Sequence, residues 1–162
     1  MDQRTARRQP APRLRTNLDT DFLKLIAILS MLLDHIGAVF FPEHPAFRWV
    51  GRLAFPIFAF MAVEGYFHTH SFKKYAQRLL LFAVLSEIPF DLMYGGTWFY
   101  PVHQNVIWTL LLALLGVRLI ETVRKKQKTW LYLLTAALVT VIWTLLGTLG
   151  MVDYYGAGIL TV

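Results

Sequence analysis

The 162-residue chain is 56% apolar, 15% aromatic and 16% charged, with a mean hydropathy of +0.48. Soluble domains average about 25% charged residues, and uncharged runs such as 106–116 and 129–151 do not fit inside a soluble fold of this size. Composition therefore excludes most soluble enzymes and indicates a polytopic membrane protein. The absence of cysteine excludes disulfides, thiolate zinc sites and a cysteine nucleophile. In a membrane protein a net charge of +6 reports topology, and we expect no nucleic-acid partner.

The first segment of the chain, residues 1–20, combines five arginines with Pro10 and Pro12 and cannot bury a core. We expect a disordered cytoplasmic tail that contacts anionic lipid, followed by one transmembrane domain over 21–162. The pair Arg7 and Arg8 resembles a twin-arginine signal. The apolar run behind it is long, carries charges and has no small-residue cleavage site, so we expect no cleaved signal peptide.

Hydrophobic segments follow in regular succession and predict an all-α fold. We expect five transmembrane helices, at 22–41, 47–67, 75–94, 105–123 and 130–149. A sixth segment begins near Gly156 and stops in mid-run at Val162, which favours a longer parent protein.

The loops between these segments alternate in charge. Loops 68–75 and 120–129 are basic, as is the tail, whereas loops 42–47, 95–104 and 150–155 contain no Lys or Arg. Because cytoplasmic loops carry the excess of basic residues, this alternation predicts a cytoplasmic N-terminus.

Ionisable residues at membrane depth are costly and usually functional. With a rise of about 1.5 Å per residue, His35 lies about 20 Å above the inner face of a core about 30 Å thick. Several helices and loops bring further polar residues to the same outer band; these are Asp34, Arg52, Glu87, Asp91, Asn105 and Asp153. Glu64 falls instead at the inner end of its helix. A shared functional site is one interpretation, and polar cross-linking of helices is the other.

Prolines and paired carboxylates point to the same band. Pro56 and Pro89 each remove a helix hydrogen bond, which either frees a carbonyl for a ligand or only kinks the helix. Glu87 and Asp91 share a helix face, and two such carboxylates call for a nearby cation, for which Arg52 is available.

A histidine beside a carboxylate is suited to general acid–base chemistry, and an Arg or Asn donor can hold an oxyanion. These residues therefore fit acyl transfer to an amine or hydroxyl. The same residue types also fit a proton- or solute-coupled transporter, a metal-assisted membrane hydrolase, or a structural subunit of a secretion or conjugation apparatus.

Motifs along residues 20–160 resemble the TraX family in unbroken order. The matching runs are 23–28 (LKLIAI), 31–37 (MLLDHIG), 51–60 (GRLAFPIFAF), 63–66 (VEGY), 86–91 (SEIPFD), 104–106 (QNV) and 153–156 (DYYG). The resemblance implies a multi-pass protein of the bacterial inner membrane, related to the F-pilin acetylase of conjugation and to transmembrane acyltransferases.

The resemblance also implies roles for individual residues. Asp34 and His35 would hold the catalytic position, with Arg52 assisting. From their shared depth, and not from the resemblance, we expect Glu87, Asp91, Asn105 and Asp153 to contact the substrate. The donor would be acetyl-CoA, its phosphates near Lys73, Lys74 and Arg78, and the acceptor an extracytoplasmic amine such as a pilin N-terminus. No metal is expected.

Overall fold

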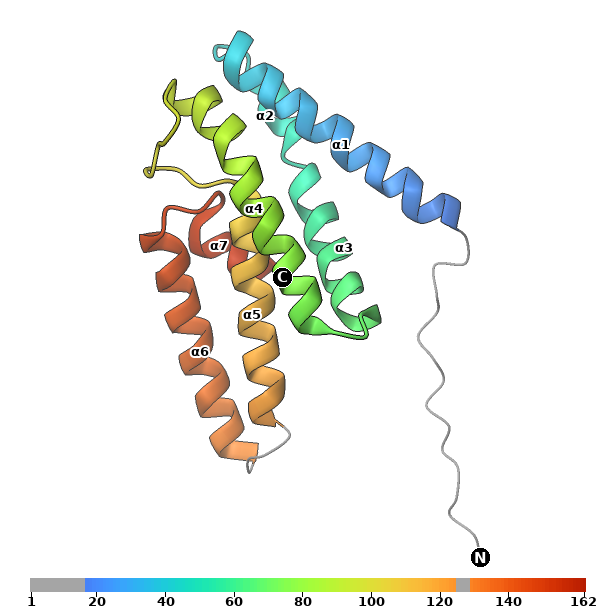
Figure 1. Cartoon of the computed structure of the whole chain (residues 1–162), viewed down its shortest axis with the longest axis vertical. Helices are drawn as coiled ribbons and strands as arrows, with labels where there is room; N and C mark the ends of the chain where they lie inside the picture. The colour runs from blue at the N-terminus through green and yellow to red at the C-terminus, as the bar shows by residue number, and fades with distance from the viewer. Residues whose placement is uncertain (1–16, 125–128) are drawn as a thin grey trace, which may run out of the picture.

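The computed structural model describes residues 17–124 and 129–162, and the regular structure in those ranges is helical (Figure 1). The helices are α1 (Asn17–Phe40), α2 (Pro45–Gly51), α3 (Ala54–His68), α4 (Phe72–Gly95), α5 (Val106–Arg124), α6 (Thr129–Leu149) and α7 (Tyr155–Thr161). The predicted tail lies outside the described residues up to position 16. From Asn17 onward the chain is already helical, earlier than the sequence analysis placed the first helix.

Four helical stretches are long and apolar enough to cross a membrane, at 19–40, 45–68, 106–124 and 129–149. The all-α, polytopic fold class is thereby confirmed. The third predicted span folds as α4, which is 24 residues long. This helix is less apolar than the four stretches above, because it carries basic residues near its start and Glu87 and Asp91 near its end. A fifth crossing by α4 stays a prediction.

The second predicted helix, 47–67, corresponds to the apolar stretch 45–68, but two residues divide this stretch into two helices. The chain turns at Arg52 and Leu53, so that α2 ends at Gly51 and α3 begins at Ala54. Pro56 then falls in the first turn of α3, where its missing N–H costs no helix hydrogen bond. Its role is to begin a helix, and it frees no carbonyl in mid-membrane.

Two glycines, Gly37 and Gly51, let α2 pack closely against α1. A Cβ on Gly37 would lie 2.3 Å from the Cβ of Phe47, and one on Gly51 would lie 2.3 Å from the Cβ of Asp34. No side chain fits in those spaces, so α2 folds back along the end of α1.

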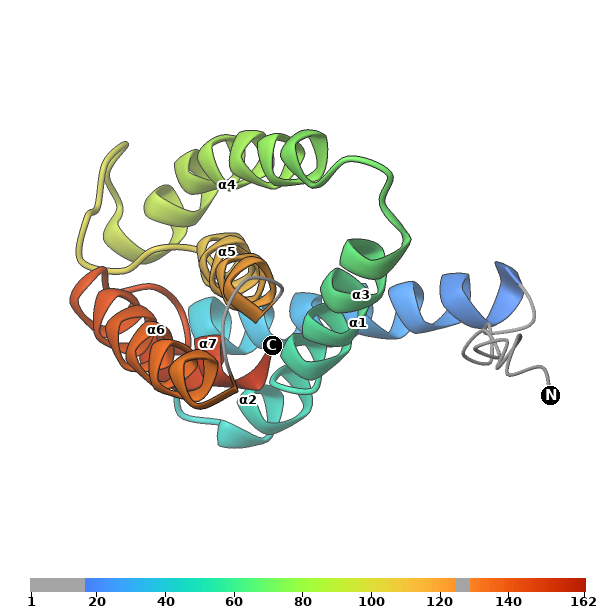
Figure 2. The same ribbon diagram turned by 90° about the horizontal axis from the view of Figure 1, so that it is seen from below.

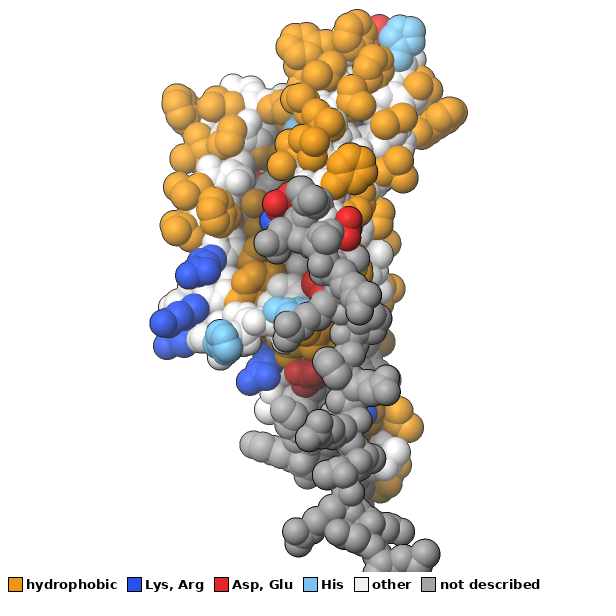
Figure 3. Space-filling model, turned by 90° about the vertical axis from the view of Figure 1, so that its right-hand side faces the viewer, with side chains coloured by type: hydrophobic (Ala, Val, Ile, Leu, Met, Phe, Trp, Pro, Cys, Tyr) orange, Lys and Arg blue, Asp and Glu red, His pale blue; other side chains and the backbone are white. Residues whose placement is uncertain are grey.

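Helix α5 lies at the centre of the bundle and contacts α3, α4, α6 and α7 (Figure 2). Buried side chains of α3 and α5 form the main core cluster, which consists of Phe55, Ala59, Ala62, Tyr66, Leu110 and Leu114. The outward faces of α1, α4 and α6 expose large apolar side chains, as a lipid-facing surface does. Figure 3 shows hydrophobic side chains covering the upper part of one face, with Lys and Arg side chains gathered lower down.

The sixth predicted segment is the short helix α7, which packs against α5 and α6. Gly156 and Gly158 make this contact possible, because a Cβ on them would lie 2.7 Å from the Thr144 carbonyl oxygen and the Thr109 Cγ2, respectively. A parallel β-bridge between Gln104 and Val152 ties the loop before α5 to the loop before α7.

Replacement of Gly51 tests the α1–α2 contact. We expect Gly51→Ala to lower the free energy of unfolding by about 1–3 kcal/mol, because its methyl group overlaps the backbone and side chain of Asp34. Thermal unfolding in detergent micelles measures the change. Val50→Ala, at an exposed position of the same helix, is the control. Equal stability of the two variants would contradict the contact.

Candidate functional site

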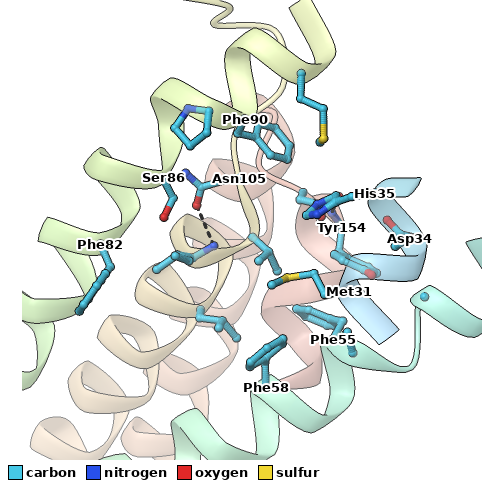
Figure 4. Close-up of a pocket in the computed structure, with 18 of the residues that line it drawn as sticks. Met31, Asp34, His35, Phe55, Phe58, Phe82, Ser86, Phe90, Asn105 and Tyr154 are labelled. Carbon is cyan, nitrogen blue, oxygen red and sulfur yellow. Dashed lines mark hydrogen bonds between the residues drawn. The ribbon is translucent and has the colours of Figure 1, made fainter. Parts of the chain in front are cut away.

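A cavity of about 490 Å³ lies between α1, α3, α4 and α5, and Tyr154 from the loop before α7 also lines it (Figure 4). Apolar side chains make up most of its wall; they are Met31, Ala54, Phe55, Phe58, Leu79, Phe82, Pro89, Phe90, Met93, Val106, Ile107 and Leu110. Figure 4 shows Phe82 on one side and Asp34, His35 and Tyr154 on the opposite side. The cavity therefore has a mostly apolar wall and a charged end at Asp34 and His35, called the polar end from here on, while Ser86 and Asn105 lie across the cavity from that end.

Four of the predicted site residues line this cavity together: Asp34 and His35 from α1, Asn105 before α5, and Asp153 before α7. Their helices and loops are far apart in the sequence. The other three residues of the predicted outer band, Arg52, Glu87 and Asp91, do not line the cavity, and Figure 4 shows Asn105 across it from His35. His35 is half-buried there beside Asp34, and in Figure 4 its ring lies next to Tyr154.

Asp34 is paired with Arg48, which is not among the predicted site residues. The Arg48 Nη1 lies 2.5 Å from the Asp34 Oδ2 and 3.4 Å from the Tyr94 hydroxyl. The buried Oδ1 of Asp34 has no hydrogen-bond donor among the described residues. Because Arg48 precedes Arg52 by one helical turn, helical spacing offered a signal for it. The packing of α2 against α1 is what places Arg48, and not Arg52, beside Asp34.

Arg52 does not line the cavity. Its guanidinium lies over the Tyr154 ring, 5.3 Å from the ring centroid, and the residue is exposed. Tyr154 itself stacks on Phe55 with the ring centroids 4.1 Å apart, and it has a left-handed backbone with φ of 62°. Arg52 is thus placed at the rim, behind an aromatic wall residue, because the helix turns at this position.

Glu87 and Asp91 accept hydrogen bonds from neutral donors. The prediction that Arg52 would be the cation beside these two carboxylates was wrong. Glu87 accepts hydrogen bonds from the Asn105 Nδ2 at 2.5 Å and from the Trp108 indole at 2.7 Å. Asp91, which is 2% exposed, accepts one from the Tyr100 backbone N–H at 2.9 Å. The sequence could not predict these donors, because they come from α5 and from the loop before it, which are distant in the sequence from the two carboxylates.

Asn105 also donates to the Ala83 carbonyl at 2.8 Å and is buried. Both of its amide hydrogens are therefore committed to α4. Asn105 lines the cavity and cross-links α4 to α5. Its remaining polar atom is the side-chain oxygen, which accepts a hydrogen bond from the Ile107 N–H.

Asp153 is fixed by its own loop. Its backbone N–H donates to the Gln104 carbonyl, and its carbonyl accepts from the Thr109 hydroxyl. His103 Nε2 lies 3.7 Å from its carboxylate, and the His103 ring stacks on Phe90. Burial raises the pKa of Asp153, although the charge of His103 opposes the shift.

Burial, with a contribution from the Asp153 charge, raises the pKa of Tyr154 to about 12. Tyr154 is therefore protonated at neutral pH and can donate a hydrogen bond. His103 and Tyr154 were both missed as functional residues, although each stands next to a residue that was selected.

Lys73, Lys74 and Arg78 lie on the first two turns of α4 and are exposed. They do not line the cavity, whose first residue on this helix is Leu79. Contact of these residues with CoA phosphates remains a prediction. Within the described ranges, no group of three or more His, Asp or Glu side chains is placed to hold a metal ion.

Residues 19–162 match a protein family described as TraX protein. Over 106 residues the chain is 39% identical to "Probable fimbrial assembly protein FimC, serogroup H1" of Dichelobacter nodosus, a match that covers 59% of this chain and 43% of that protein. Over 68 residues it is 37% identical to "Uncharacterized protein RP591" of Rickettsia prowazekii (strain Madrid E), a match that covers 42% of this chain and 25% of that protein. The chain thus spans less than half the length of these relatives. No solved structure matches it.

The cross-link made by Asn105 can be tested by removing its amide. We expect Asn105→Leu to lower the free energy of unfolding by about 1–3 kcal/mol, because the Ala83 carbonyl and the Glu87 carboxylate each lose a donor. Thermal unfolding followed by tryptophan fluorescence measures this. Gln104→Leu, which keeps the backbone bridge to Val152, is the control. If both variants unfold with wild-type midpoints, the cross-link contributes nothing.

The raised pKa of Asp153 predicts a pH dependence of stability. Above about pH 4 the unfolded carboxyl has lost its proton while the folded one still holds it, so stability falls as pH rises through the raised value. We expect the melting temperature of the wild type to fall more steeply with pH than that of Asp153→Asn. Parallel melting curves for the two proteins from pH 4 upward would refute this assignment.

Proposed function

The chain belongs to the TraX family, and we propose that it is a membrane-embedded acyltransferase acting on an amine, such as the N-terminus of a pilin or fimbrial subunit. The observation that carries this proposal is the meeting of His35, Asp34 and Asp153 at the polar end of one apolar cavity. Acid–base groups at the end of a water-poor cavity suit a reaction in which a proton must be moved and water excluded.

In the proposed reaction His35 accepts a proton from the acceptor amine as the amine nitrogen attacks the acyl carbonyl carbon. The bond from that carbon to the leaving group then breaks, and the leaving group takes the proton from His35. The neighbouring carboxylate of Asp34 stabilises the imidazolium that forms between these steps.

The developing oxyanion needs a hydrogen-bond donor, and Tyr154 is suited to supply it. Tyr154 lines the cavity and keeps its proton at neutral pH. Asn105, which the sequence analysis considered for substrate contact, has both amide hydrogens bonded to α4. Arg52 lies at the rim, where it can meet a substrate but not the reacting carbonyl.

Two further parts of the proposal come from the relatives. A relative named as a fimbrial assembly protein supports an acceptor that belongs to a pilus or fimbria. The implied donor, acetyl-CoA, and the location in a bacterial inner membrane come from the family resemblance. Since the chain covers less than half of that relative, the activity proposed is that of these helices together with whatever the longer proteins add.

A proton-coupled transporter is the second candidate. It is favoured by three buried carboxylate oxygens, on Asp34, Glu87 and Asp91, that find no donor among the described residues. Such a transporter would show pH-driven solute flux in proteoliposomes without any acyl donor, whereas the acyltransferase would show none.

The test measures acyl transfer in proteoliposomes, with radiolabelled acetyl-CoA and octanoyl-CoA as donors and a peptide with a free N-terminus as acceptor. We expect His35→Ala to reduce the rate by about 100-fold or more, because it removes the general base. His44→Ala, an exposed histidine in the turn between α1 and α2, is the matched control and should keep the wild-type rate. Transfer by His35→Ala at the wild-type rate would remove His35 from the mechanism.

A further inference from the structure

The long apolar wall of the cavity exceeds what an acetyl group needs. Along α4 the lining residues run from Leu79 to Met93, which corresponds to about 21 Å at about 1.5 Å per residue. Half of a hydrocarbon core about 30 Å thick is about 15 Å. The wall on α4 is therefore long enough to accompany one acyl chain of a membrane lipid through its leaflet.

The cavity is also open toward the surface. Phe82 lines it and is nevertheless 58% exposed, so the cavity reaches the outside of the bundle at this side chain. Helix α4 packs on α5, and side chains of α1 and α3 form the wall of the cavity that faces α4. A chain can thus enter sideways from the surrounding hydrocarbon.

A cation stands at the polar end of the same cavity. Arg52 is exposed, lies against the outer side of Tyr154, and makes no ion pair with a carboxylate in the described part of the chain. The two carboxylates at that end have partners of their own, since Asp34 pairs with Arg48 and Asp153 faces His103. Although the Arg52 charge acts on Asp153 through space, no carboxylate of the described residues lies within ion-pair distance of Arg52, and its guanidinium can bind an anion.

We propose that this cavity is a phospholipid-binding site, in which one acyl chain lies along Leu79, Phe82 and Phe90 of α4 and the headgroup phosphate binds Arg52. The ester carbonyl of the lipid then lies at the polar end near His35. This binding does not rest on the proposed acyl transfer.

The arrangement distinguishes a phospholipid from an acyl-CoA. In a phospholipid the phosphate is only a few bonds from the ester, which matches a cation one aromatic ring away from the cavity. In an acyl-CoA the pantetheine arm separates the phosphates from the thioester.

The test titrates delipidated protein in detergent with a phosphatidylglycerol that carries a fluorescent acyl chain. We expect one saturable site per chain. Arg52→Gln should weaken the affinity about tenfold, as loss of a charge-assisted bond does, while dodecanol, which has a chain but no phosphate, should compete equally well in both proteins. Leu79→Trp should weaken the binding of both ligands, because the larger side chain fills the apolar end of the cavity. Leu80→Trp, at the neighbouring exposed position of α4, should weaken neither.

Three results would overturn the site. One is unchanged affinity for the phospholipid in Arg52→Gln, a second is unchanged affinity in Leu79→Trp, and a third is failure of an unlabelled phospholipid to displace the probe. If Leu79→Trp aggregates on gel filtration, Phe82→Trp closes the same end of the cavity. Lipid binding without acyl transfer would refute only the proposed function, and transfer without saturable lipid binding would refute only this site.

Discussion

The ion pair between Asp34 and Arg48 joins α1 to α2 at the place where Gly51 lies against the backbone of Asp34. Because no side chain separates the helices there, α2 lies back along α1 and carries Arg48 to the carboxylate. The same turn after Gly51 sends Arg52 to the outside of Tyr154. One close helix contact thus decides which arginine neutralises Asp34 and which stays free at the cavity rim.

The remaining acidic groups are stabilised without cations. Glu87 receives donors from Asn105 and Trp108, and Asp91 receives the N–H of Tyr100. These bonds join α4 to the start of α5 while α4 leaves a cavity on its other side. A rigid polar attachment on one side and an apolar wall on the other let α4 border a cavity without collapsing into it.

The two proposals depend on different parts of that cavity. Acyl transfer depends on the polar end, where His35, Asp153 and Tyr154 lie, and lipid binding depends on the apolar wall and on Arg52. A chain held along α4 would bring its carbonyl to the polar end in the orientation that lipids already have in a leaflet.

The sequence by itself determined the membrane-spanning, all-α fold class and the approximate position of most helices, because hydrophobic runs depend only on order along the chain. It did not determine the break at Arg52, the pairing of Arg48, or the donors of Glu87. Those choices depend on which helix faces meet, and the meeting of Gly51 with Asp34 and of Asn105 with Glu87 is decided by packing between segments far apart in the sequence.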